Sequence, residues 1–390
     1  MDSSALAAHR SPGPRRLLFV ITEDWFFVSH FLVLAEAARD QGFAVSVHLR
    51  NNDPRHVARI AAAGIRVIAS DYDRATAGRR GDLRQIARFA ALFRTERPDV
   101  VHIVSLRVVV LAGLAARLTG VPARVHALTG MGLLGAARGL RARLTQRGLG
   151  ALLRHALGGR GAGFVFENRD DPRGLGFTQT DARLLVVGGA GIDPEIESPL
   201  PLPDGTPLRI AIVARMIHSK GIEVAVAALG LARQRGADVT LTLVGAIDPG
   251  NPRSLTEDRL RTFGALPGVE WVGPTRDVRA VWRTHHVACV PSLGGEGLPR
   301  SLLEAAAAGR AIVTTDTPGC ATFVRPLQEG LVVPPGDVAA LAEAFTRLAA
   351  DRPLVASLGT AARARVLDGY TVSAVSTAMT GFYDALLSRR

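Results

Sequence analysis

Two pairs of charged residues in the second half of the chain have the types and spacing needed to bind a sugar linked to phosphate. Arg215 precedes Lys220 by five positions, and Glu296 precedes Glu304 by eight. Cations stabilise phosphate charge, whereas carboxylates accept hydrogen bonds from hydroxyl groups such as those of a sugar or a ribose. Lys220 is the only lysine among 47 basic residues. An ammonium group is compact and a guanidinium is a planar fork, so arginine does not simply replace lysine in a tight phosphate site. The alternative is a lysine that survived by chance in an arginine-biased chain.

A glycine-rich segment, PSLGGEGLPRSLLEAAAAG (291–309), surrounds the two glutamates. An apolar strand runs into it, and Pro299 is expected at the first position of a helix, where a missing N–H costs nothing. Free backbone amides at the helix start would then bind an anion. The residues expected to surround such an anion and the hydroxyl groups attached to it are Gly294, Gly295, Gly297, Leu298 and Glu304. The alternative is a helix N-terminus with a favourable acidic residue and no ligand.

The hydropathy pattern predicts a framework that brings these loops together. Short apolar strands alternate with helical patterns of ten or more residues, which indicates βαβ units and parallel sheets. Strands are expected at 15–22, 43–49, 65–70, 99–105 and 123–129, and again at 208–214, 239–245, 269–273, 286–292 and 311–315. Between these two series, DPEIESPLPLPDGTP (193–207) carries five prolines and is typical of a linker. We therefore predict an α/β protein of two doubly wound, Rossmann-like domains that face an interdomain cleft, where such sheets bind ligands.

The quoted motifs resemble those of the GT-B-fold retaining glycosyltransferases of family 4. The resemblance lies in the R-x4-K pair Arg215 and Lys220 and in the E-x7-E pair Glu296 and Glu304. The segments VEWVGPTRDV, TTDTPGC and EGLVVPPGD fit the same family. The match is close over 208–345 and looser over 15–195. In that looser part, ITEDWFFVSHF and FENRDD resemble a subgroup that builds bacterial surface polysaccharides.

The resemblance implies a hexosyltransferase that uses a nucleotide diphosphate sugar, with UDP as the expected nucleotide, and no metal or other cofactor. Arg215, Lys220 and Glu296 would be the catalytic residues: the two cations bind the diphosphate, and Glu296 touches the donor sugar. Glu304 would hold the ribose hydroxyls. The expected acceptor is a glycan or a polyprenyl-diphosphate-linked intermediate. Within enzymes, the alternative is a sugar-nucleotide epimerase of the same fold.

Composition and the resemblance together predict the domains of the chain and their roles. A disordered tail (1–14) would precede an acceptor-binding domain (15–193), a proline-rich linker (194–207) and a nucleotide-sugar-binding domain (208–370). The C-terminal helix (371–390) would pack back on the first domain. Acceptor-side candidates are Glu23, Asp24, His30, His126 and Asn168. The alternative for the first of these is structural, with Asp24 as a helix cap and the aromatic residues beside it in interdomain packing.

The sequence departs from the family at two positions. Many family members have a histidine where this chain has Thr129, and His126 lies three residues earlier, so the usual histidine role cannot be transferred. Thr322 stands where a glutamate is common.

Two other short motifs point to chemistry that their surroundings do not support. The DYD motif (Asp71 to Asp73) mimics a metal-binding pattern, but it is far in sequence from the diphosphate motifs. GMGLLG (130–135) mimics a dinucleotide fingerprint, but no acidic residue follows before Glu167, so a ribose partner is missing. The two cysteines, Cys289 and Cys320, form no disulfide framework or metal pattern and are expected to be packing residues.

The net charge of +12 is concentrated between Val100 and Phe166, which contains no Asp or Glu. Its nine arginines are Arg107, Arg117, Arg124, Arg138, Arg141, Arg143, Arg147, Arg154 and Arg160. Part of this stretch, 135–157, can form a basic amphipathic helix with Leu140, Leu144, Ala151 and Leu152 on one stripe. We expect a cytoplasmic protein held peripherally on the anionic inner face of the membrane. The alternatives are an ordinary surface helix and a basic nucleic-acid-binding protein, although no aromatic-interleaved basic motif appears.

Overall fold

The N-terminal half of the chain builds a parallel sheet of seven strands. The computed structural model describes residues 13–70, 78–136, 139–196 and 198–389. The strands are β1 (Arg16–Glu23), β2 (Ala44–Arg50), β3 (Arg66–Ala69), β4 (Val100–Val104), β5 (Ala123–Leu128), β6 (Ala162–Phe166) and β7 (Leu184–Val186). Their order is β3-β2-β1-β4-β5-β6-β7. β1 pairs in parallel with both β2 and β4, so the direction of winding changes between β1 and β4.

A second sheet of six strands follows the proline-rich segment. It consists of β8 (Leu208–Val213), β9 (Val239–Val244), β10 (Val269–Gly273), β11 (Val287–Val290), β12 (Ala311–Thr315) and β13 (Gly330–Val333). The order is β10-β9-β8-β11-β12-β13, and every pairing is parallel. Winding changes direction between β8 and β11. Ligands of open α/β sheets bind at the carboxyl ends of strands at such a point.

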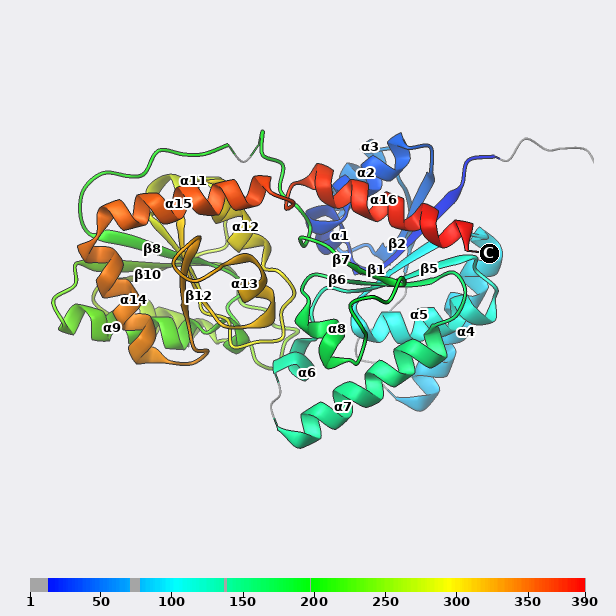
Figure 1. The fold of residues 1–390 in the computed structure, drawn as a ribbon, viewed down its shortest axis with the longest axis horizontal. Helices are drawn as coiled ribbons and strands as arrows, with labels where there is room; N and C mark the ends of the chain where they lie inside the picture. Colours follow the sequence, from blue (N-terminus) through cyan, green and yellow to red (C-terminus); the bar gives the residue numbers. More distant parts are fainter. Residues whose placement is uncertain (1–12, 71–77, 137–138, 197, 390) are drawn as a thin grey trace, which may run out of the picture. The chain divides into compact units, whose positions relative to one another are not determined.

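Helices connect the strands of both sheets (Figure 1). The helices that lie between β1 and β7 along the chain are α1 (Asp24–His30), α2 (Leu32–Asp40), α3 (Pro54–Ala62), α4 (Arg79–Glu96), α5 (Leu106–Leu118), α6 (Gly132–Ala136), α7 (Leu140–Ala151), the π-helix η1 (Leu152–Leu157) and α8 (Asp170–Gly174). After β8 come the 3-10 helix η2 (His218–Lys220), α9 (Ile222–Gln234), α10 (Glu257–Gly264), α11 (Val278–Thr284), α12 (Arg300–Ala307), α13 (Pro318–Phe323), α14 (Val338–Ala350), α15 (Arg352–Leu367) and α16 (Val372–Ser388).

Local sequence explains where several of these helices begin. Asp277, Asp337 and Asp351 precede α11, α14 and α15, and each carboxylate accepts a hydrogen bond from the backbone N–H three residues later. Such a cap satisfies one of the free amides at a helix start and contributes about 1 kcal/mol. The helices then bury one face against the sheet, as Leu229 of α9 and Phe345 of α14 do in the core of the second sheet.

The expected α/β fold with two doubly wound parallel sheets is confirmed. All ten strands named from the hydropathy pattern are present, with ends within three residues of the expected ones. The pattern does not identify β6, β7 and β13. Two of these are short, since β7 has three residues and β13 has four, and β6 follows a glycine-rich segment that gives no clear helix boundary.

Contacts divide the chain into two compact units. Unit 1 comprises Met1–Ala127, Leu153–Phe164 and Met379–Arg390, and unit 2 comprises Leu128–Leu152 and Val165–Ala378. The proline-rich segment is held within unit 2, where the buried Arg310 guanidinium donates to the carbonyls of Leu200 and Pro201 at 2.8 Å each. The end of α16 belongs to unit 1, where the Tyr383 hydroxyl lies 2.6 Å from Nδ1 of the buried His102.

Candidate functional site

The predicted cationic loop and the glycine-rich loop meet at the switch point of the second sheet. Arg215 and η2 follow the end of β8, and the loop Ser292–Leu298 follows the end of the neighbouring strand β11. The backbone N–H of Leu293 donates to the Ser219 carbonyl at 2.8 Å. Gly221 has φ +69°, and a Cβ atom there would lie 1.9 Å from the Pro291 carbonyl oxygen. Only glycine therefore allows this close approach of the two loops.

Lys220 and Glu296 form the central contact of this site. The Nζ atom of Lys220 lies 2.7 Å from Oε1 of Glu296, and the two side chains are only 20% and 15% exposed. The Ser292 hydroxyl donates to the same carboxylate oxygen at 2.9 Å. Two residues expected to contact different parts of the donor are thus adjacent, at the end of β11. Their assigned roles toward a donor stay predictions.

Arg215 lies in the same region and forms an ion pair that was not predicted from the sequence. Its NH1 atom is 2.6 Å from Oδ2 of Asp248, which follows β9, the other neighbour of β8. The Arg215 side chain is 51% exposed, so this pair is partly solvated and contributes little to stability. The sequence does contain a signal for this pair. The carboxyl ends of parallel strands lie at one edge of a sheet, so an acidic residue in the loop after a neighbouring strand, here Asp248, is a candidate partner for Arg215.

The glycines of the Gly294–Leu298 loop allow three backbone segments to touch. A Cβ atom at Gly295 would lie 2.0 Å from the Gly132 carbonyl oxygen, and one at Gly297 would lie 2.0 Å from Oε2 of Glu167. Gly319 of α13 approaches from another side, since a Cβ atom there would lie 1.4 Å from the Gly297 carbonyl oxygen. No side chain fits at these three positions without a shift of the backbone. All of these contacts lie within unit 2.

The structure changes two expectations about the start of α12. Pro299 precedes the helix as its N-cap, one position earlier than expected, with ψ of 125°. The Leu298 amide, expected to be free for an anion, donates to Oε2 of Glu167 at 3.0 Å. Leu298 is therefore held by a protein carboxylate, and the expectation of a free amide there was wrong.

Glu304 lies on α12 beside a basic residue of the same helix. Its Oε1 atom is 2.7 Å from Nε of Arg300, at the i, i+4 spacing that aligns side chains on one helix face. Glu304 is 15% exposed and Arg300 is 34% exposed. The pair limits the rotamers of the glutamate, so its carboxylate keeps one position relative to the helix.

Glu167 and Asp171 are carboxylic acids in buried surroundings. Burial raises the pKa of Glu167 to about 7, and the nearby charge of Asp171 adds to the shift, while the hydrogen bond from Leu298 opposes it. Burial likewise raises the pKa of Asp171 to about 6. FENRDD (166–171) includes Glu167, but the sequence does not indicate its partner, Leu298, which lies 131 positions away.

Asn168, an acceptor-side candidate, has its side chain committed inside the fold. It is fully buried. Its Oδ1 atom accepts from the backbone of Asp170 and Asp171, and its Nδ2 atom donates to the Asp171 carboxylate at 2.8 Å. These bonds shape the turn that starts α8, so the Asn168 side chain has a structural role.

The other early candidates belong to unit 1. Asp24 is fully buried, and its carboxylate accepts from the backbone of Trp25, Asn52 and Asp53. Burial alone would raise the pKa of Asp24, but these hydrogen bonds together with one from the Asn52 side chain lower it. Asp24 thus ties the loop after β2 to the start of α1, which is a structural role, but it is the first residue of the helix and not its cap, since Glu23 is the N-cap.

Glu23 and His30 are the polar groups on either side of α1. Glu23 accepts from Nδ2 of Asn52 at 2.8 Å and lies 3.7 Å from the Arg50 guanidinium. His30 Nδ1 is 2.6 Å from the Ser29 hydroxyl, and its ring packs on Phe26 at 4.3 Å. Of the aromatic residues here, Phe27 is buried, whereas Trp25 is 42% exposed.

His126 is a core residue of the first sheet. It is fully buried in β5, with its ring 5.2 Å from that of Phe164. A Cβ atom at Gly113 of α5 would lie 2.9 Å from its Cε1 atom. Burial, helped by the nearby charge of Arg124, lowers the pKa of His126 to about 3, so the imidazole is neutral. The His126 side chain therefore packs in the core of unit 1.

Near its C-terminal end, the acid-free stretch (100–166) forms α7 and η1, and three leucines of these helices are exposed to solvent. Leu140, Leu144 and Leu152 are 73%, 59% and 39% exposed, and Arg141, Arg143 and Arg147 are exposed beside them. Arg138 of the predicted basic face lies outside the described residues, as does the DYD motif. No described helix is long and apolar enough to cross a membrane. Within the described ranges, no group of three or more His, Cys, Asp or Glu is placed to hold a metal ion.

Two family models match the chain on either side of the proline-rich segment. Residues 16–155 match "Glycosyl transferase 4-like", and residues 207–351 match "Glycosyl transferases group 1". Each of these two segments is thus similar to a glycosyltransferase domain. The C-terminal match contains Arg215, Lys220, Glu296 and Glu304.

Known proteins with similar sequences or structures narrow the comparison. A Streptomyces coelicolor exopolysaccharide phosphotransferase is 33% identical over 38% of this chain and 16% of its own length. A putative colanic acid biosynthesis glycosyltransferase, WcaL of Escherichia coli, is 32% identical over 43% of each chain. The chain therefore spans less than half of the length of these curated relatives. The Anabaena protein HepE, solved with UDP and glucose, matches the fold with TM-score 0.74, covering 95% of this chain and 99% of HepE at 16% identity. That likeness confirms the GT-B fold.

Proposed function

We propose that this protein transfers a hexose from a UDP-sugar to a glycan or polyprenyl-diphosphate-linked acceptor in cell-surface polysaccharide synthesis. The observation that carries the proposal is the contact of Lys220 and Glu296 at the switch point of the second sheet. A cation and a carboxylate at this point match a donor that has both a diphosphate and sugar hydroxyls. The HepE structure with UDP and glucose and the WcaL relative support the choice of nucleotide and of product class.

Transfer breaks the bond between the anomeric carbon of the donor sugar and the β-phosphate oxygen. The electron pair of that bond stays on the leaving diphosphate, whose added charge Lys220 and Arg215 stabilise. Fixed charges of this kind contribute about 2.7–4 kcal/mol each to lowering a barrier. The acceptor oxygen bonds to the anomeric carbon, and its proton passes to a phosphate oxygen. Attack on the face that the phosphate leaves gives retention of configuration.

In this scheme the two side-chain cations do the work that a metal ion does in other glycosyltransferases. Glu296 accepts hydrogen bonds from the donor sugar, and Glu304 holds the ribose hydroxyls, with Arg300 fixing its rotamer. Of the acceptor-side candidates, His30 is half-buried, whereas the Glu23 side chain is buried and accepts from Asn52. Asp24, His126 and Asn168 support the fold around them.

The acceptor class accounts for the exposed basic face of α7. Leu140 and Leu144 with Arg141, Arg143 and Arg147 combine apolar and cationic groups on one surface element. Such a face suits the interface of an anionic membrane, where a polyprenyl-linked acceptor lies. We therefore propose a protein held peripherally on that surface.

The proposal is tested with purified protein, a panel of UDP-sugars and other nucleotide sugars, and polyprenyl diphosphate-linked acceptors. A UDP-sugar is expected to raise Tm, because a ligand that binds the native state stabilises it. Addition of the acceptor should release UDP and give a joined product with the donor's anomeric configuration, read by NMR. Isomerised sugar without transfer would instead indicate an epimerase, and no effect of any nucleotide sugar would refute the proposal.

A further inference from the structure

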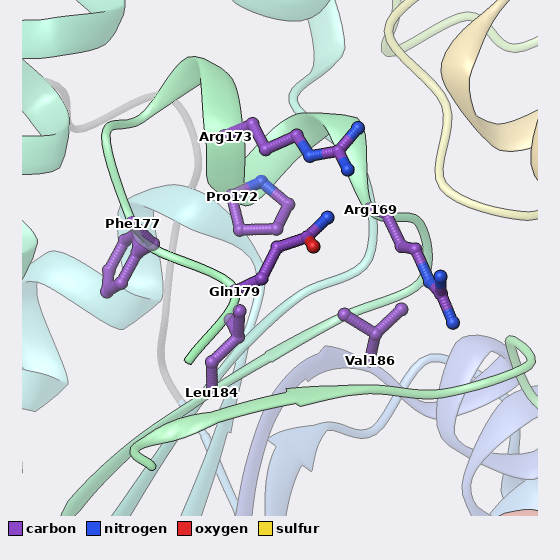
Figure 2. Close-up of a pocket in the computed structure, with 7 residues that line it drawn as sticks. All are labelled: Arg169, Pro172, Arg173, Phe177, Gln179, Leu184 and Val186. Atoms are coloured by element: carbon purple, nitrogen blue, oxygen red, sulfur yellow. The ribbon is translucent and has the colours of Figure 1, made fainter. Parts of the chain in front are cut away.

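A pocket outside the Lys220 and Glu296 region lies between α8 and the edge strand β7. Its volume is about 310 Å³, at the small end of ligand pockets. Arg169, Pro172, Arg173, Phe177, Gln179, Leu184 and Val186 line it. Figure 2 shows the guanidinium groups of Arg169 and Arg173 toward the right of the view, with the Gln179 amide just below the Arg173 side chain. All of these residues belong to unit 2.

The two arginines differ in how far the protein already uses their guanidinium groups. Both side chains are exposed, and no carboxylate of the described residues lies within ion-pair distance of Arg169. Arg173 is 3.4 Å from the Asp170 carboxylate, but both partners are more than half exposed, so this pair is weak. With its amide oxygen turned toward Arg173, Gln179 accepts from Nε at 2.9 Å and also from NH2, so this edge of the Arg173 guanidinium is occupied and Arg173 acts on a ligand mainly through its charge. That contact steadies the Arg173 fork beside the pocket.

The remaining lining is apolar. Pro172 and Phe177 are buried, and the Phe177 ring packs on Phe166 at 5.8 Å between centroids. Leu184 and Val186 are two positions apart on β7 and so lie on one face of the strand. A ligand that fits must combine an anionic group for the guanidinium forks with a body that tolerates aliphatic and aromatic walls.

The pocket is connected by the chain to the glycine-rich loop. Glu167 accepts from the Leu298 amide, and Arg169 follows it by two residues at the start of α8. Asn168, between them, is fixed by its bonds to Asp170 and Asp171. The backbone that carries Arg169 is therefore anchored at the loop that borders the proposed donor site.

We propose that this pocket is an acceptor subsite for an anionic group, a carboxylate or a phosphate, carried by the acceptor. Planar guanidinium groups bind either oxyanion through paired N–H donors, and the apolar walls receive the sugar ring or lipid stem next to it. The inference rests on the proposed transferase function and adds to it that the acceptor is acidic. The two sources of such a group are an acidic sugar unit and a lipid-borne phosphate.

The test measures binding and transfer separately. The probes are glucuronate, the neutral analogue glucose, and farnesyl diphosphate as a short lipid phosphate, each titrated into the full chain. The variants are Arg169→Gln and Arg173→Gln. Arg347→Gln is the control, since Arg347 is an exposed arginine on α14 outside the pocket. Each protein must first show wild-type Tm.

We expect glucuronate, farnesyl diphosphate or both to bind wild type, and glucose not to bind. Each pocket variant should lose about tenfold or more in affinity for the bound probe, as for the loss of a charge-assisted hydrogen bond, and Arg347→Gln should not. Preference for glucuronate identifies an acidic sugar, and preference for farnesyl diphosphate a lipid phosphate. In transfer assays the pocket variants should raise the KM for the acceptor and leave the KM for the UDP-sugar unchanged.

Anion binding that ignores Arg169 and Arg173, or none at millimolar probe, would overturn the subsite. Arginine-dependent binding with an unchanged acceptor KM would overturn its role toward the acceptor. Failure of the transferase proposal has a different signature, because wild type would then show no response to UDP-sugars whatever the anion titration gives.

Discussion

The single lysine of the chain, Lys220, contacts Glu296 at 2.7 Å, across the ends of two neighbouring strands. Lys220 ends η2, and Glu296 lies in the loop after β11. Both side chains are mostly enclosed, so each limits the positions of the other. A cation held in this way has its position fixed before a diphosphate arrives, which lowers the reorganisation needed for catalysis.

Replacement of this lysine by arginine tests the geometry of the contact. Lys220→Arg keeps the charge but puts a broad planar group where a compact ammonium lies 20% exposed. We expect kcat/KM to fall at least about tenfold, equivalent to about 1.4 kcal/mol of transition-state stabilisation. Tm should stay near that of wild type. Wild-type turnover in the arginine variant would mean that the lysine has no special role.

The two glutamates should separate binding from turnover. Glu304→Ala removes a proposed ribose contact that exists in every bound state, so we expect UDP to bind about tenfold or more weakly. Glu296→Gln keeps the size of the side chain and its contact with Ser292 but removes the charge opposite Lys220. It should mainly lower kcat, with UDP affinity within about threefold of wild type.

Calorimetry with UDP and steady-state kinetics distinguish these effects. Arg300→Gln is a matched variant for Glu304, because it removes the partner that fixes the rotamer and should weaken UDP binding less than Glu304→Ala does. Normal UDP binding and normal turnover in both glutamate variants would place the donor elsewhere.

The sequence predicts the meeting of these residues because it predicts a doubly wound parallel sheet. Alternation of short strands and helices implies a parallel sheet, and the loops after neighbouring strands then share one edge. That reasoning places Arg215, Lys220 and the glycine-rich loop together without coordinates. It also explains why Asp248, in the loop after β9, could have been named as a partner of Arg215.

Contacts set by long-range packing could not be predicted in the same way. Glu167 holds the Leu298 amide across 131 positions, and no local pattern marks that pairing. His126 looks like a site residue in sequence, but every residue of β5 is buried, and the histidine faces the core. Asp24 begins α1 and Asn168 lies just before α8, and only the structure shows that backbone amides donate to their oxygens.

The tight packing of the glycine-rich loop predicts a sensitive position at Gly297. In Gly297→Ala the new Cβ atom would lie 2.0 Å from the Glu167 carboxylate and 2.7 Å from the Thr129 carbonyl oxygen. We expect a loss of about 1–3 kcal/mol in stability, as for other overpacked sites, together with weaker UDP binding. The control is Gly230→Ala in α9, where nothing lies within 4 Å and alanine should stabilise the helix by up to about 1 kcal/mol. Equal Tm values for the two variants would show that the loop has room.

Glu167 predicts a dependence of stability on pH. The pKa of Glu167 is about 7 in the folded protein, raised from 4.5 mainly by burial. Below pH 4.5 the carboxyl group is protonated in both states. Between pH 4.5 and 7 the unfolded chain releases this proton while the folded chain keeps it, so the free energy of unfolding falls as pH rises. At 1.36 kcal/mol per pKa unit the loss is about 3 kcal/mol.

The comparison of wild type with Glu167→Gln isolates this effect, because glutamine cannot ionise and can still accept from the Leu298 amide. The Tm of the variant relative to wild type should rise between pH 5 and pH 8. Asp171, whose pKa is raised to about 6, shifts wild type and variant in the same direction at lower pH. Glu343→Gln, which changes an exposed carboxylate on α14, should show no such trend. A constant difference between Glu167→Gln and wild type across this range would contradict the assignment.

The basic face of α7 predicts binding to anionic membranes. Leu140 and Leu144 are 73% and 59% exposed, so the apolar stripe is not used for packing. Each arginine near an anionic surface adds about 1 kcal/mol of attraction. The triple variant Arg141→Glu, Arg143→Glu and Arg147→Glu should lose sedimentation with phosphatidylglycerol vesicles, and wild-type binding should fade as salt rises, because salt screens exposed charges. A charge-matched control reverses three exposed arginines elsewhere, Arg253, Arg276 and Arg347. Equal losses in the two triple variants would assign the binding to net charge rather than to α7, and no sedimentation of wild type would leave the exposed leucines without a membrane role.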